Sequence, residues 1–240
     1  MFKKFSNYFQ NFFIYLTFII ILSIFCVTAY IIQESTSTTA RLSKIITTKD
    51  GKVSRALFSP QDNIKDIIIN LIEHEQKSIN LAIYSFTDPD ITKALIDAHN
   101  RGIRVEVAVD RGYASDKFSR VSQLANAGIF VTVFQPKISG DSKLNCIMHN
   151  KFFVFSKNLK NKQILVTGSF NCTRSANSSN KENVIITEDQ EIINSYIQEF
   201  INLKKSCMPI SGQNIILDSC DSKSDTGGFW GKLLNFDWLF

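Results

Sequence analysis

Short apolar runs alternate along the chain with longer segments in which apolar residues recur every three or four positions. The short runs are typical of buried strands, and the longer segments have the period of amphipathic helices. Predicted strands span 53–58, 79–86, 103–109, 129–134, 145–155, 163–167 and 184–187, and predicted helices span 63–76, 88–100, 116–127 and 190–205. Asp88 and Pro89 open the second helix with a cap and a first-turn proline, and Gly102 ends it.

This alternation of strands and helices predicts an α/β fold, with a mixed, largely parallel sheet flanked by helices on both faces. The strand 145–155 ends in a run that is apolar on both faces, as expected of a central strand covered on each side. The last three strands are expected to form an antiparallel portion. The polar stretch 157–162 predicts a hairpin turn between two of them, and the polar stretch 137–144 a loop bordering a substrate groove.

The apolar stretch 12–32 has 21 positions without a charge. As a helix it would cover about 30 Å, enough for a hydrocarbon core. Lys3 and Lys4 precede it, which predicts a transmembrane anchor with a cytoplasmic N-terminus and an exported domain. A cleaved signal peptide is the alternative, because 27–29 fits a cleavage site and export would follow equally. In a mitochondrial protein the anchor could instead leave the domain facing the cytosol.

The chain divides by composition into four segments. Residues 1–32 are a signal anchor or signal peptide, 33–51 a linker rich in Ser and Thr, 52–207 an α/β domain and 208–240 a tail ending in dense aromatics. The tail could sit at a bilayer interface or cover an apolar groove, and both readings stay open. The formal net charge of +5 suits an anionic partner, either nucleic acid or an acidic membrane, and does not choose between them.

The chain has five cysteines, of which one, Cys26, lies in the apolar stretch. In an exported domain Cys146, Cys172, Cys207 and Cys220 allow three pairings. A local Cys207–Cys220 bond and a Cys146–Cys172 bond are both open, and buried free thiols are the alternative. The sequence contains no spacing of His and Cys that is typical of zinc ligands, so it predicts neither a metal nor a cofactor.

Five polar residues in three separate segments carry the candidate chemistry: His149, Lys151, Ser169, Asn171 and Glu182. The first two are two positions apart, so on one strand their side chains would leave the same face. The next pair repeats this spacing just after the strand 163–167. Together they supply a nucleophile, a cation, hydroxyl and amide donors and a carboxylate, the groups needed to cleave a phosphodiester without a metal.

This arrangement resembles the HxK…GSxN motif of the phospholipase D superfamily, and most of all its single-motif branch of Nuc-type endonucleases and mitochondrial cardiolipin hydrolases. The resemblance covers residues 52–207 and implies a phospholipase D-like catalytic domain. It implies that His149 attacks phosphorus and forms a covalent phosphohistidine. Lys151, Asn171 and Ser169 would hold the equatorial oxygens. Glu182 would accept the other ring N–H of His149 and so fix its tautomer.

A second histidine is needed to protonate the leaving alkoxide and then to activate water. The chain has only one such motif, and His74 and His99 fall in predicted helices and are assigned no role. We therefore predict a homodimer with one active site on the two-fold axis, to which each subunit contributes His149.

The substrate stays open at this level. The membrane segment and the aromatic tail favour a phospholipid, which is our preferred substrate. Lys143 and Arg174 are assigned to substrate binding, and with Lys137 and Lys181 they could form a basic strip for DNA or RNA.

Ser156 departs from the family pattern, which usually has Asp five residues after the motif lysine. This departure keeps a third hypothesis open, a membrane-tethered family member that binds phosphate or lipid without turnover.

Overall fold

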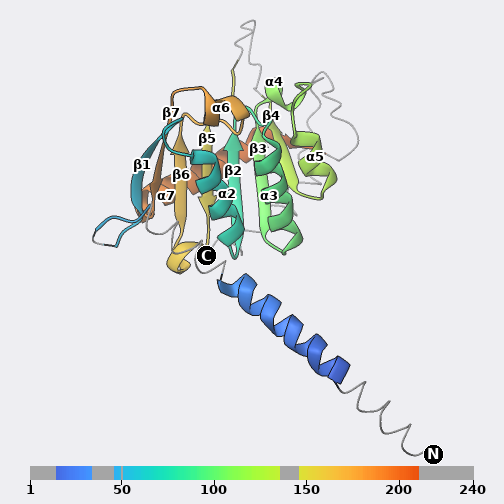
Figure 1. Ribbon diagram of the computed structural model, residues 1–240. Coiled ribbons are helices and arrows are strands. Elements are labelled where there is room, and N and C mark those ends of the chain that lie inside the picture. The colour runs from blue at the N-terminus through green and yellow to red at the C-terminus, as the bar shows by residue number, and fades with distance from the viewer. Residues whose placement is uncertain (1–14, 34–45, 50, 136–145, 211–240) are drawn as a thin grey trace, which may run out of the picture.

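The structure is a computed structural model that describes residues 15–33, 46–49, 51–135 and 146–210. One sheet contains eight strands in the order β1-β7-β6-β5-β2-β3-β4-β8 (Figure 1). The strands are β1 (Ser54–Ser59), β2 (Ser78–Ile83), β3 (Arg104–Val109), β4 (Phe130–Phe134), β5 (Lys151–Phe155), β6 (Ile164–Gly168), β7 (Glu182–Thr187) and β8 (Cys207–Pro209). The helices are α2 (Ile64–His74), α3 (Pro89–Asn100), α4 (Arg111–Ala114), α5 (Val121–Asn126), α6 (Arg174–Ser178), α7 (Gln190–Lys205) and the 3₁₀ helix η1 (Leu159–Asn161).

The sheet is mixed, as predicted, but the prediction that it is largely parallel is wrong. Of the seven strand pairings that the structure describes, only β2 with β3 and β3 with β4 are parallel. These strands are joined by helical crossovers, which parallel neighbours require. The short polar stretch around η1 joins β5 to β6 as an antiparallel hairpin, and β7 continues that pattern. The predicted antiparallel portion is therefore confirmed, and it extends to β1 and to β2.

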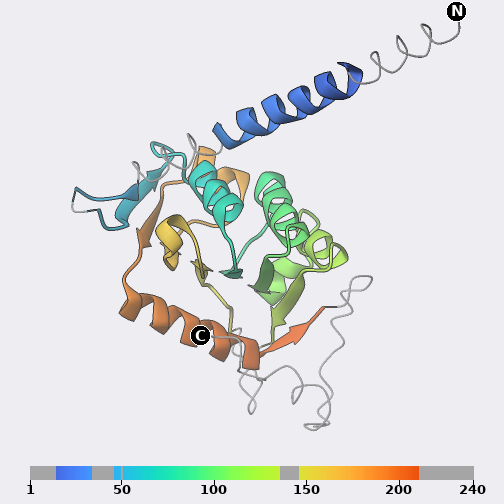
Figure 2. The same cartoon turned by 90° about the horizontal axis from the view of Figure 1, so that it is seen from below.

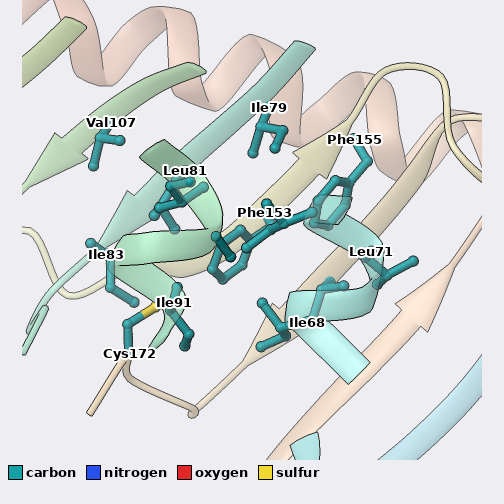
Figure 3. Close-up of a cluster of buried hydrophobic side chains, with 14 of the residues drawn as sticks. Ile68, Leu71, Ile79, Leu81, Ile83, Ile91, Val107, Phe153, Phe155 and Cys172 are labelled. Atoms are coloured by element: carbon teal, nitrogen blue, oxygen red, sulfur yellow. The ribbon is translucent and has the colours of Figure 1, made fainter. Parts of the chain in front are cut away.

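Helices cover both faces of the sheet, as predicted. Figure 2 shows α2, α3 and α5 over one face and α7 across the other. The central strand β5 is buried on both sides. Phe153 and Phe155 enter the core under α2 and α3 (Figure 3), while Phe152 and Val154 enter a second core beneath α7. This burial explains why its residues are apolar without alternation.

Two predicted helices match the structure closely because their caps are encoded locally. Asp88 accepts hydrogen bonds from the backbone N–H groups of Asp90 and Ile91 at the start of α3. Asp189 caps α7 in the same way, and α7 spans the predicted residues 190–205.

The predicted helix 116–127 is shorter in the structure, which is helical in that range only over α5 (Val121–Asn126). The chain forms the short α4 first, where Asp110 accepts the N–H of Gly112, and resumes as α5 at Val121. Between them the N–H of Arg120 donates to the carbonyl of Phe86, which holds this loop beside the end of β2. The strand β8 and the helix α6 were not predicted, because segments of three and five residues carry too little periodicity.

The N-terminal helix Tyr15–Gln33 has 19 residues and a mean hydropathy of 2.4, long and apolar enough to cross a membrane. This helix fits a membrane anchor or a signal segment. The predicted loop 137–144, most of the linker, the aromatic tail and Cys220 lie outside the described residues.

Four cysteines lie in the part of the chain that the structure describes, and all four are free thiols. Cys146 is exposed and Cys172 is buried, so the pairing of these two is not formed. Burial raises the pKa of Cys172 well above its ordinary value and that of Cys207 to about 11. Both buried thiols are therefore protonated at neutral pH and pack as small apolar side chains.

Ser156 follows β5 at the end opposite Lys151, about 16 Å away along an extended strand. Its hydroxyl forms a 2.6 Å hydrogen bond with that of Ser78, and it touches none of the candidate catalytic residues. The family pattern usually has an aspartate at the position of Ser156, and here a carboxylate is supplied close by from another residue. This residue is Glu75, which is 3% exposed at the end of α2. Glu75 accepts hydrogen bonds from the N–H groups of Lys77 and Lys157 and from two further donors.

Glu75→Ala is expected to lower the free energy of unfolding by about 3 kcal/mol, because several buried donors lose their acceptor. Glu73→Ala, an exposed carboxylate on the same helix, is the matched control and should change it by less than about 0.5 kcal/mol. Urea unfolding measures both. Equal effects of the two substitutions would show that Glu75 does not stabilise this turn.

Candidate active site

Four strand ends meet at one edge of the sheet. β2 ends there with Ile83, which pairs with Lys151, the first residue of β5. β6 ends there with Gly168, which pairs with Val184 near the start of β7. Antiparallel pairing therefore brings the three motif segments to the same edge, although they lie up to 33 positions apart in the sequence.

His149 precedes β5 and does not share the strand with Lys151 as predicted, because the ladder begins at Lys151. Its side chain is exposed. The chain beside it is fixed by Asp110, a carboxylate only 3% exposed, which accepts the N–H of Met148 at 2.9 Å. The other oxygen of Asp110 accepts the N–H of Gly112. One buried carboxylate therefore holds the residue before His149 against the loop that follows β3.

Lys151 is 8% exposed, which is unusual for a lysine. Its Nζ donates to the backbone carbonyl of His149 at 2.7 Å and lies 4.9 Å from the centroid of the Tyr84 ring. Burial lowers the pKa of Lys151, and the carboxylate of Glu182 opposes this shift. An ammonium has three donors, so two are left for an anionic ligand at this edge.

Tyr84 was missed in the sequence. It follows the last residue of β2, and its ring centroid lies 4.4 Å from that of His149 in an edge-on arrangement, with 68° between the planes. The centroid of the Tyr84 ring also lies 4.4 Å from the centroid of the Tyr113 ring. A hydrogen bond with Tyr113 raises the pKa of Tyr84, so the phenol is protonated. The only available signal was that Tyr84 and Ser85 interrupt an apolar run at a strand end.

Asn171 is held through its amide oxygen, which accepts the backbone N–H of Ser85 at 3.2 Å. This bond leaves the amide nitrogen as a donor at the edge. The next residue, Cys172, is bridged to Phe86, and its carbonyl accepts the N–H groups of Thr87 and Asp88. The chain leaving β2 therefore fixes the position of Asn171.

Ser169 and Glu182 form a pair. The Ser169 hydroxyl donates to Oε2 of Glu182 at 2.6 Å, and the side chain of Asn180 donates to Oε1 at 2.9 Å. No hydrogen bond joins Glu182 to His149 within this chain, although both residues are described, so the predicted contact is not formed. The reason is the strand order: β6 lies between β7 and β5, which separates their backbones by roughly 9.5 Å.

Gly168 lies where β6 and β7 approach each other closely. A Cβ on this residue would lie 2.0 Å from the carbonyl oxygen of Asn183 and 2.8 Å from the Cα of Val184. Glycine is therefore needed here for the close approach of β7, and this approach places Ser169 beside Glu182.

Of the two basic residues assigned to the substrate, Lys143 lies outside the described residues. Arg174 is exposed at the first position of α6. Lys65, with a smaller contribution from Arg174, lowers the pKa of Asp90, which places Arg174 near the start of α3. Lys181 is exposed next to Glu182. In the described part of the chain, no three His, Cys, Asp or Glu side chains are grouped as metal ligands.

Much of this chain is similar in sequence to known proteins. Residues 68–204, more than half of the chain, match the family described as the phospholipase D-like domain of cardiolipin synthase. A phospholipase D from Rickettsia conorii is 38% identical over 156 residues, which cover 65% of this chain and 71% of that protein. The mitochondrial cardiolipin hydrolase of Xenopus tropicalis is 33% identical over 144 residues, covering 60% and 62%.

A solved structure of a phospholipase D family member has a similar fold. The crystal structure of Nuc from Salmonella typhimurium, a phospholipase D family member, is 26% identical with a TM-score of 0.56, covering 66% of this chain and 97% of that one. Fold, edge geometry and relatives together define a phosphodiester hydrolase. The chain belongs to the phospholipase D superfamily, in its single-domain branch.

Proposed function

We propose that this hydrolase cleaves its substrate through a covalent phosphohistidine at His149, without a metal, in an active site shared by two subunits. The observation that carries the proposal is the buried ammonium of Lys151, bonded to the backbone of the adjacent His149. Among the described residues no carboxylate forms an ion pair with this ammonium, and Glu182 acts on it only from a distance. A buried positive charge held in this way is costly, so its retention indicates an anionic ligand. The exposed imidazole next to it can reach a phosphorus atom held there.

In this mechanism the neutral His149 ring attacks phosphorus, and the leaving alkoxide departs on the opposite side. Lys151 and the amide nitrogen of Asn171 donate to the equatorial oxygens, where negative charge concentrates in the transition state. Glu182 orients the Ser169 hydroxyl and favours the protonated form of Lys151. These donors are fixed before the substrate arrives, which is what makes such stabilisation effective.

The leaving alkoxide needs a proton, and the phosphoenzyme needs an activated water. The described residues of one chain offer no second imidazole at this edge, since His74 and His99 lie on α2 and α3. We assign this acid and base to the His149 of a second subunit across a two-fold axis. An exposed apolar side chain supports a contact between subunits near His149. Ile147, two residues before His149, is 54% exposed.

We favour a phospholipid as the substrate. In this proposal residues 1–32 anchor the protein and 33–51 link the anchor to a catalytic domain that begins at residue 52. The predicted end of this domain at residue 207 moves to the end of β8 at Pro209, and the aromatic tail follows. The apolar helix would hold the site near lipid head groups, with the domain on the extracytoplasmic side. Two of the relatives carry names that specify a lipid substrate.

Nucleic acid is the second candidate substrate, and a separate observation favours it. Arg174 and Lys181 are exposed on the segments that lead to and from the Gly-Ser-x-Asn and Glu-Asn residues. Such a pair could bind the neighbouring phosphates of a single strand. The likeness to Nuc is consistent with this alternative.

A paired substrate assay tests the proposal. The full-length protein in detergent is given cardiolipin and phosphatidylcholine micelles, and separately a labelled single-stranded oligonucleotide, each with and without EDTA. We expect lipid hydrolysis that EDTA does not reduce and that His149→Asn abolishes. Cleavage of the oligonucleotide alone would replace the lipid with nucleic acid. Hydrolysis of neither would support a non-catalytic binder, and loss of activity with EDTA would contradict the metal-free mechanism.

A further inference from the structure

Tyr84 contacts both residues to which the mechanism gives the central roles. The centroid of its ring is 4.4 Å from the centroid of the His149 imidazole, and 4.9 Å from Nζ of Lys151. The Tyr84 ring is partly buried, whereas the His149 side chain is exposed. A partly buried aromatic ring therefore contacts both an exposed imidazole and an ammonium.

The sheet fixes where Tyr84 lies. Ile83, the residue before it, pairs with Lys151 in the β2–β5 ladder. The residues after it are fixed as well, since the N–H of Ser85 bonds to Asn171 and Phe86 bridges to Cys172. Tyr84 therefore lies between two anchored points, and its ring has little freedom to leave the site.

His149 needs such a support. The residue lies outside the strand ladder, and the carboxylate of Glu182, which was expected to orient the imidazole, is bonded to Ser169 and Asn180 within this chain. Among the residues that the structure describes, only Tyr84 contacts the His149 imidazole with an aromatic ring. An exposed imidazole without it would occupy several rotamers, and an error of about 1 Å in a nucleophile costs on the order of a hundredfold in rate.

We propose that Tyr84 is a positioning residue, whose aromatic ring orients the His149 imidazole for attack and holds the Lys151 ammonium beside it. The proposal rests on the roles of His149 and Lys151 given above. The edge-on contact is attractive because the rim of one ring faces the electron-rich face of the other. The electron-rich face of an aromatic ring also attracts an ammonium such as that of Lys151. The ring, and not the hydroxyl, is therefore the active part of Tyr84.

Two substitutions separate the ring from the hydroxyl. Tyr84→Leu removes the aromatic face, and Tyr84→Phe keeps it while removing the hydroxyl. Phe118→Leu, an exposed aromatic in the loop between α4 and α5, is the matched control. Turnover of bis(p-nitrophenyl) phosphate by the full-length protein in detergent gives kcat and KM, and thermal unfolding confirms that each variant is folded.

We expect Tyr84→Leu to lower kcat by about thirtyfold, with KM changed by less than about threefold. Tyr84→Phe should keep kcat within about threefold of the wild type, and Phe118→Leu should match the wild type. A Tyr84→Phe variant as slow as Tyr84→Leu would overturn the proposal, as would an effect on KM alone.

A second readout does not depend on catalysis. The chain has three histidines, so the imidazole proton signals of His149 are identified in an NMR spectrum by their loss in His149→Asn. Tyr84→Leu should move these signals, because the ring current of Tyr84 is removed, and Tyr84→Phe should leave them in place. Unmoved signals in Tyr84→Leu would overturn the proposal even if the protein hydrolyses nothing. If His149→Asn instead keeps full activity, the proposed mechanism fails while this contact can still be measured.

Discussion

His149→Asn is expected to lower kcat for phosphodiester hydrolysis by about 10⁴-fold or more, the largest effect of any single substitution in this protein. The change removes the proposed nucleophile and, in the proposed shared site, the general acid and base as well. Asn is close to His in size and polarity, and the site is an exposed position, so the fold should be kept. Rates of bis(p-nitrophenyl) phosphate hydrolysis measure the loss.

The matched control for this substitution is His99→Asn. His99 lies near the end of α3, and that helix starts at the active-site edge and runs away from it. This variant should keep kcat within about twofold. A His149→Asn protein that retained more than a hundredth of the wild-type rate would exclude His149 as the nucleophile.

Lys151→Met is the second large effect, with an expected loss of about 10³-fold in kcat. The substitution keeps the volume of the buried side chain and removes the charge that we propose stabilises the transition state. Lys157→Met, at an exposed lysine just beyond β5, is the control and should leave kcat unchanged. A loss in Lys151→Met that appears only in KM would show that the ammonium binds substrate and does not stabilise the transition state.

Lys151 should also make the rate of hydrolysis depend on pH. Burial lowers the pKa of Lys151, so its ammonium loses its proton at a lower pH than an exposed lysine does. The rate should therefore fall on the alkaline side at a pH below 10.5, the ordinary value. Glu182 opposes the shift, so Glu182→Gln should move this fall to still lower pH. An alkaline limb that does not move in Glu182→Gln would contradict this assignment.

The local elements of the fold could be predicted from the sequence, but the sheet pairing could not. Asp88 and Asp189 mark their helices by capping chemistry that acts within four residues, and both helices were placed correctly. Strand direction depends on which strands become neighbours. The runs in β5 and β6 are apolar on both faces, as in a parallel sheet, yet each is buried between helices in an antiparallel arrangement.

The candidate site could also be predicted only in part from the sequence. The motif spacing predicted that the three segments lie together, and antiparallel pairing at one edge brings them there. The partner of Glu182 could not be predicted, because it depends on β6 lying between β7 and β5. Tyr84 could not be predicted either, since its contacts with His149 and Lys151 arise only when β2 pairs with β5.

The central claim is that two copies of His149 act on one phosphorus atom, and mixing subunits tests it most directly. Wild-type protein and His149→Asn protein are unfolded together, refolded in equal amounts and assayed at constant total concentration. A shared site requires two intact subunits, so the activity should fall to about one quarter of the all-wild-type value, the square of the wild-type fraction. An activity of about one half would show that each subunit works alone, and would contradict the shared site.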